Sequence, residues 1–156
     1  MFRTAAVLVC AVALAACGGG GNGTAPIAGP SDKYVGAWGS CLFTGPGTIS
    51  VSIAFSFNRI DANQLAYTLT ATGFSNPDCT GPVPGAMVTQ SGTVSVDGTG
   101  IADGKPIEKI TTTAAGVSDK DIVYLNGNQF QFGNETPVDA DGYPTTLDTS
   151  VVFTRQ

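Results

Sequence analysis

A strict alternation of large apolar side chains with small or polar ones runs along residues 48–58, TISVSIAFSFN. One face of this stretch carries all of its large apolar side chains: Ile49, Val51, Ile53, Phe55 and Phe57. Successive side chains of a β-strand point to opposite faces, so a period of two predicts a strand with one buried face. Half-buried strands of this kind are typical of antiparallel sheets.

The same pattern recurs on both sides of this stretch. Leu65, Tyr67 and Leu69 alternate with threonines, and Asn126-Gly127 separates two apolar runs in the way that a type I′ hairpin turn requires. Further strands are predicted at residues 34–44, 87–96, 107–113, 122–125, 128–132 and 151–153. About eight short strands between Gly, Pro, Asn and Asp clusters predict an all-β domain. We expect a single antiparallel meander barrel, which protects its strand edges by closing on itself, and a β-sandwich is the alternative.

The composition excludes several classes of function. The chain has 156 residues and a net charge of −5, and its lysines and arginines are scattered singly. Because nucleic acids and anionic lipids attract clustered positive charge, we expect no nucleic-acid partner. The chain has no histidine, which excludes Ser-His-Asp and Cys-His catalysis and argues against zinc or copper sites. We therefore expect a protein that is not an enzyme and that has neither cofactor nor metal.

The N-terminus has the features of an export signal. A short positive segment precedes an apolar stretch, residues 5–16, which at about 12 residues fits a signal peptide and is too short to cross a bilayer. The stretch ends in Leu14-Ala15-Ala16-Cys17, which resembles the lipobox of bacterial lipoproteins. In that family a peptidase cuts before the cysteine, and the cysteine thiol carries a diacylglycerol. The alternative is an ordinary signal peptide cut near Ala16.

The resemblance divides the chain into three parts. Residues 1–16 would be removed, and residues 17–32 would form a lipidated Cys17 followed by a tether. The tether is rich in Gly and Pro, a composition typical of linkers. Residues 33–156 would form the barrel domain. Because Gly18 is not acidic, the resemblance implies a lipid anchor at the periplasmic face of the outer membrane.

Two cysteines remain in the barrel domain, Cys41 and Cys79. An even pair in an exported protein predicts a disulfide, with two unpaired thiols as the alternative. Closing a loop of about 39 residues would stabilise the fold by roughly 4 kcal/mol through the unfolded chain.

A second resemblance lies at the start of this domain. Tyr34-Val35-Gly36-Ala37-Trp38 resembles the Gly-x-Trp opening of lipocalin-like (calycin) barrels. In that superfamily the tryptophan packs at the closed barrel end beneath an arginine from near the last strand. Arg155 follows the last apolar strand here, so the resemblance implies a Trp38–Arg155 cation–π contact. The alternative for Trp38 is an ordinary core aromatic. The chain as a whole is also similar to small proteobacterial lipoproteins.

Two groups of carboxylates are candidate sites. Asp119 and Asp121 could form a glycosidase pair, which needs two carboxyls about 5–10 Å apart, but the residues also fit a solvated strand start. Residues 139–142, Asp-Ala-Asp-Gly, resemble the first half of a calcium loop, with Glu135 and Asp148 nearby. The closing glutamate of such a loop is missing from the required spacing, and a turn is the favoured interpretation.

Two functions remain. The first is a lipid-anchored module whose barrel binds a small apolar ligand, because an eight-stranded barrel can hold one. Its pocket would be lined by aromatic side chains: Phe55, Phe57, Tyr67, Tyr124, Phe130 and Phe132. The alternative is a structural or protein-interaction lipoprotein with a solidly packed barrel. The sequence predicts no oligomeric state.

Overall fold

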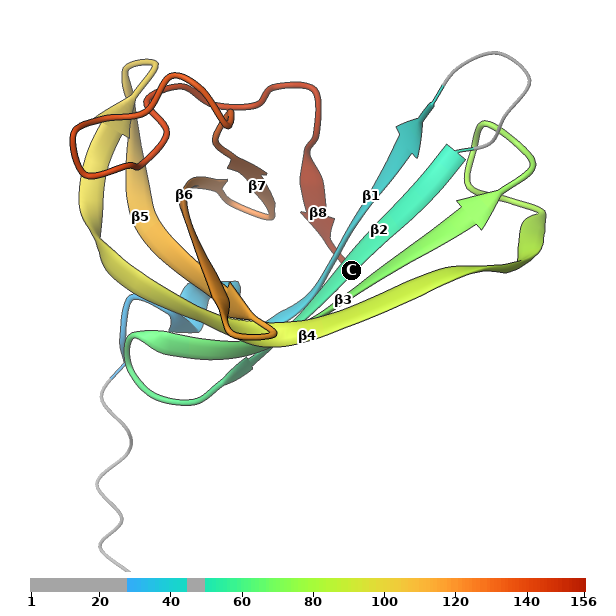
Figure 1. Cartoon of the computed structure of the whole chain (residues 1–156), viewed down its shortest axis with the longest axis horizontal. Helices are drawn as coiled ribbons and strands as arrows, with labels where there is room; N and C mark the ends of the chain where they lie inside the picture. Colours follow the sequence, from blue (N-terminus) through green and yellow to red (C-terminus); the bar gives the residue numbers. More distant parts are fainter. Residues whose placement is uncertain (1–27, 45–49) are drawn as a thin grey trace, which may run out of the picture.

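The computed structural model describes residues 28–44 and 50–156, with the backbone alone for residues 82–86. It shows eight antiparallel strands that close into one barrel, in which each strand pairs with its neighbours in sequence and β8 pairs with β1 (Figure 1). The predicted all-β meander barrel is confirmed, and the sandwich is not formed. Within the described ranges, no helix has the length and apolar character needed to cross a bilayer.

The elements follow one another as η1 (Asp32–Tyr34), β1 (Gly36–Phe43), β2 (Ser50–Arg59), β3 (Gln64–Phe74), β4 (Pro82–Ala102), β5 (Lys105–Ala114), β6 (Val117–Asn126), β7 (Gln129–Phe132) and β8 (Phe153–Arg155). In β2 the exposure alternates as predicted from Ile53 to Asn58, whereas Ser50, on the predicted outer face, is fully buried. Residues 48 and 49 lie outside the described residues. β4 and β6 are longer than predicted. The added residues 98–102 of β4 and 117–121 of β6 pair with β5 through their backbones and have no regular apolar alternation in the sequence.

The last strand, β8, pairs with only a small part of β1, so the barrel is closed over only part of the length of its first strands. Trp38 and Gly39 pair with β8, whereas residues 40–43 of β1 pair within the described chain only with β2. Strands β1 to β4 therefore extend beyond the closed part and fan out from it (Figure 1). On this extension a disulfide joins Cys41 of β1 to Cys79 in the β3–β4 loop, with an S–S distance of 2.08 Å. The predicted disulfide is confirmed.

The barrel interior holds the main core, centred on Trp38, Leu65 and Phe130, which are at most 2% exposed. A second, smaller core lies outside the barrel wall. There the segment between β7 and β8, residues 133–152, packs Tyr143 and Leu147 against Ile122. Consecutive residues of β6 are buried as a result, Ile122 on the outer face and Val123 on the inner one. In β6, therefore, an apolar side chain can face either the barrel interior or the outer core.

Candidate functional site: an apolar cavity in the barrel

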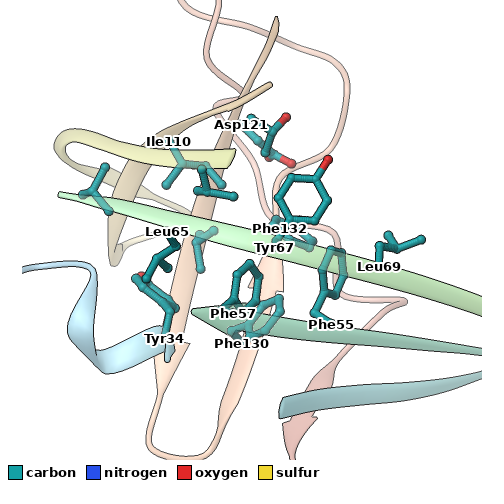
Figure 2. Close-up of a pocket in the computed structure, with 14 residues that line it drawn as sticks. Tyr34, Phe55, Phe57, Leu65, Tyr67, Leu69, Ile110, Asp121, Phe130 and Phe132 are labelled. Atoms are coloured by element: carbon teal, nitrogen blue, oxygen red, sulfur yellow. The ribbon is translucent and has the colours of Figure 1, made fainter. Parts of the chain in front are cut away.

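A cavity of about 220 Å³ lies inside the barrel, among strands β2 to β7 (Figure 2). Aromatic and aliphatic side chains form most of its wall. The 14 residues that line it are Tyr34, Phe55, Phe57, Leu65, Tyr67, Leu69, Val94, Val96, Ile110, Thr112, Asp121, Val123, Phe130 and Phe132. Five of the six aromatic residues predicted from the sequence are in this wall. They come together because each occupies the inward position of its strand, so the period of two in the sequence becomes one continuous surface.

The aromatic rings of the wall hold one another in place. Phe55 stacks on Phe57 with ring centroids 5.4 Å apart, and it meets Phe132 edge-on at 5.8 Å. Phe130 meets Phe57 and Phe132 edge-on at 6.3 and 5.2 Å. Stacked and edge-to-face contacts at these distances are favourable beyond simple burial. The result is a preformed aromatic wall with ring faces and edges in fixed directions.

The sixth predicted residue, Tyr124, is a correction. It is absent from the cavity wall and packs against the second core on the outer face of β6, with the Lys105 Nζ 4.8 Å from its ring centroid. Tyr124 has the same parity as Ile122, and both face away from the interior. The prediction was wrong because the strand is buried on both faces, so its apolar run did not reveal which face points inward.

The pair that the lipocalin-like resemblance implied is in contact at the barrel end nearest η1. The Arg155 guanidinium carbon lies 4.2 Å from the centroid of the Trp38 ring, and Trp38 is fully buried. Trp38 Nε1 donates a hydrogen bond of 2.7 Å to the carbonyl oxygen of Tyr34. The guanidinium donates to the carbonyl oxygens of Val35 and Lys33. Together these contacts fasten the segment before β1 to the end of the chain and close this end of the barrel.

One polar group of the cavity wall is fully engaged at this end. The Tyr34 hydroxyl donates to the carboxylate of Glu108, which is 7% exposed, and Lys33 Nζ lies 2.8 Å from the other carboxylate oxygen. Burial, followed by the neighbouring Glu108 carboxylate, raises the pKa of Tyr34 well above its usual range. The buried Glu108 thus has both a cation and a hydroxyl donor from its own chain.

The cavity wall itself contains one carboxyl group, that of Asp121, which lies on a different side of the cavity from Tyr34 (Figure 2). Its Oδ1 accepts hydrogen bonds from the backbone N–H groups of Ile122, at 2.7 Å, and Gly133, at 2.9 Å. Burial raises the pKa of Asp121 to about 6, although these two hydrogen bonds act in the opposite direction. Oδ2 accepts no hydrogen bond within the described residues. The Tyr67 hydroxyl points to the same side of the cavity (Figure 2).

The sequence groups Asp121 only with Asp119, as a candidate sugar-cleaving pair or a solvated strand start. The signal that places Asp121 in the wall is its parity: it is two residues before Val123, which faces inward. Extending the alternation backwards through the polar part of β6 would have found it. Its partner Gly133 could not be found in this way, because residues 133–152 carry no periodic pattern.

A polar groove of about 580 Å³ lies between β6 and the segment that follows β7. Its lining includes three exposed charged residues: Asp119, Lys120 and Glu135. Thr112 and Asp121 line both this groove and the interior cavity. Asp121 therefore stands at the boundary between an acidic outer groove and an apolar interior.

The turn interpretation of residues 139–142 is confirmed. Asp139 Oδ1 accepts the backbone N–H groups of Asp141 and Tyr143, and Asp139 Oδ2 lies 2.7 Å from Lys109 Nζ. Lys109 lowers the pKa of Asp139 through this contact. The lysine thus neutralises the carboxylate that a calcium ion would need.

Comparison with protein-family models, curated proteins and solved structures gave no match to this chain. The closed eight-stranded antiparallel barrel is the architecture that the lipocalin-like resemblance implies. Cys17, the lipobox and most of the tether lie outside the described residues.

Proposed function

We propose that this protein is a lipid-anchored lipoprotein of the bacterial cell envelope whose barrel binds a small apolar ligand in its interior. The observation that supports binding is the cavity of about 220 Å³. The cavity is partly open to solvent and is several times larger than the share of one water molecule in the liquid, about 30 Å³, so it has room for a small ligand. A barrel with a solely structural role has no need to leave this space between aromatic rings. The cavity therefore favours the binding function over the solidly packed alternative.

The size of the cavity limits the ligand. Pockets for drug-sized molecules measure about 300–1,000 Å³, and this cavity is smaller. It suits a molecule with one ring or a short branched chain. The preformed aromatic wall supports binding without rearrangement, which lowers the entropic cost of association.

Binding is tested by filling the cavity. Val94 lines it from β4, while the neighbouring Thr93 does not. We expect 2-phenylethanol to bind the purified full-length protein saturably in calorimetry, and we expect Val94→Phe to abolish this binding. The matched control Thr93→Phe adds the same ring to the opposite face of the strand and should leave binding intact. If neither 2-phenylethanol nor its charged analogues bind the unaltered protein saturably, the proposed function is removed.

The anchor is supported by the lipobox sequence and by the Cys41–Cys79 disulfide, because disulfides persist in exported proteins. Its test is Cys17→Ser, which should move the protein from the membrane fraction to the soluble fraction of the cell. Cys10→Ser is the matched control, since residue 10 lies in the segment that cleavage would remove. Continued membrane association of the Cys17→Ser protein would refute the anchor.

A further inference from the structure

We infer that the ligand of this cavity is a small apolar amine, which places its apolar body among the aromatic rings and its ammonium group against Asp121. This inference rests on the proposed binding in the cavity and adds the chemical class of the ligand. It follows from the contrast between Asp121, which is half-buried, and the buried carboxylate of Glu108.

The two carboxylates are satisfied in different ways. Glu108 is matched by its own chain, with Lys33 Nζ at 2.8 Å and the Tyr34 hydroxyl as donors. Asp121 receives only the two backbone N–H groups on Oδ1, and no cationic side chain forms an ion pair with it in the described chain. A half-buried carboxylate without a cation costs more to keep ionised than one in water. A ligand that carries the missing positive charge would remove this cost.

The lysine nearest in sequence is directed elsewhere. Lys120 Nζ donates to the carbonyl oxygen of Asp141 at 2.6 Å and lies 4.8 Å from the centroid of the Tyr143 ring. Both contacts belong to the outer layer of the barrel. Among the 14 residues that line the cavity, Asp121 is the only charged one. Its two backbone hydrogen bonds hold Oδ1 in a fixed position and leave Oδ2 as the open acceptor.

The rest of the wall suits an organic cation better than a metal ion. Ring faces of Phe and Tyr attract ammonium groups within about 6 Å of the ring centroid, and the Tyr67 hydroxyl on the side of Asp121 offers a second acceptor. A hard cation such as calcium needs six to eight oxygen ligands. No group of three or more possible metal-ligating side chains occurs among residues that the structure describes. The apolar wall and the single carboxylate thus select an amine with an apolar body.

The outer groove that adjoins the cavity has an excess of negative charge. Asp121 borders the outer groove, where Asp119 and Glu135 add two further carboxylates and Lys120 a single positive charge. The whole chain has a net charge of −5. A cleft with an excess of one sign of charge concentrates ligands of the opposite sign and speeds their arrival. Cations are accordingly favoured in the adjoining groove as well as beside Asp121.

The test compares three ligands of similar shape: 2-phenylethylamine, 2-phenylethanol and 3-phenylpropanoate, as cation, neutral molecule and anion. We expect the amine to bind the full-length protein at pH 7.5 at least about tenfold more tightly than the alcohol, the ratio that one charge-assisted hydrogen bond gives. Binding of the anion should be weakest. If the alcohol binds as tightly as the amine, the inference fails while the proposed function stands. If none of the three binds, the proposed function fails as well.

A variant locates the preference. Asp121→Asn keeps an oxygen acceptor for both backbone N–H groups, so we expect a folded protein in which the amine and the alcohol bind within about twofold of each other. Asp78→Asn removes the same charge from an exposed position in the β3–β4 loop and should keep the preference. Retention of the full preference in Asp121→Asn would overturn the inference.

The pH dependence provides a second readout that needs no variant. The groups around Asp121 are Asp119 and Lys120 of β6, Tyr67 of β3 and Glu135 in the segment after β7. The chain has no histidine to titrate in the same range. Because the pKa of Asp121 is about 6, the amine should lose its preference over the alcohol between pH 7.5 and pH 4.5. A preference that is unchanged at pH 4.5 would contradict the role of this carboxylate.

Discussion

Arg155 and Trp38 are direct cross-strand partners in the β8–β1 ladder, and the guanidinium lies over the indole ring. The same guanidinium donates hydrogen bonds of 2.7 and 2.6 Å to the carbonyl oxygens of Val35 and Lys33. One side chain therefore joins the last strand of the barrel to the first strand and to the segment before it. Since β8 has only three residues, much of the closure depends on this side chain.

Arg155→Met should weaken the barrel. The cation–π contact is worth about 0.5–2 kcal/mol and each hydrogen bond about 1 kcal/mol, so we expect the free energy of unfolding to fall by about 2 kcal/mol. In a domain of this size the melting temperature should fall by roughly 5–10 °C. Arg155→Lys should give an intermediate value, because an ammonium group keeps the charge but loses the planar fork that reaches both carbonyls. A Met variant as stable as the unaltered protein would show that the contact contributes nothing.

Replacing Cys41 and Cys79 together by serine should destabilise the protein by about 4 kcal/mol in the chain-entropy description. The disulfide holds the extension of β1 to β4, which lies beyond the closed part of the barrel. We therefore expect hydrogen exchange to increase first in residues 40–43 and in the β3–β4 loop. The unaltered protein in reductant should behave like the double variant. Faster exchange throughout the barrel, with no difference between extension and core, would contradict this local role.

Sequence alone was sufficient for features whose signal is local. The alternation in β2 predicted its buried face, and the order of strands along the chain predicted a meander. Gly-x-Trp and a terminal arginine, read through the family resemblance, indicated the contact between Trp38 and Arg155. Each of these features can be predicted from the residues that form it, without knowledge of how distant segments pack.

The cavity wall could be predicted only in part, because the orientation of some of its residues depends on a segment that has no periodic sequence pattern. Residues 133–152 cover the outer face of β6, so Ile122 and Val123 are both buried. The sequence of an apolar run that is buried on both faces does not show which face points into the barrel. For this reason Tyr124 was predicted on the wrong face. The role of Asp121 likewise depends on Gly133, whose N–H group comes from the same segment.

Gly92→Ala should destabilise the barrel through contacts inside it. A Cβ atom there would overlap the carbonyl oxygen of Thr113 and would lie 2.8 Å from a Tyr67 ring carbon. Overpacking of this kind costs about 1–3 kcal/mol, measurable by urea unfolding. Gly98→Ala on the same strand is the matched control, because a Cβ atom there meets nothing within 4 Å. A loss of stability equal in the two variants would mean that backbone flexibility, and not the contact with Tyr67, decides the effect.

Asp121→Asn should change stability in a pH-dependent way. Burial raises the pKa of this carboxyl to about 6 in the folded protein, above the value of about 3.9 in an unfolded chain. Below pH 4 the carboxyl is protonated in both states, and Asp and Asn should be nearly equivalent. As the pH rises through 6, the folded state must give up a proton that the unfolded state has already lost, so the unaltered protein loses stability.

Asn does not ionise, so the Asp121→Asn variant should be more stable than the unaltered protein by about 2 kcal/mol at pH 8, a figure reduced for the partial exposure of the carboxyl. Urea unfolding at pH 4 and pH 8 measures the difference, and Asp119→Asn, at an exposed position, should stay within about 0.5 kcal/mol at both values. An equal effect of Asp121→Asn at the two pH values would show that its carboxyl is not desolvated. Together with loss of the amine preference, a more stable variant would identify Asp121 as a residue that binds ligand at the expense of stability, which is typical of functional sites.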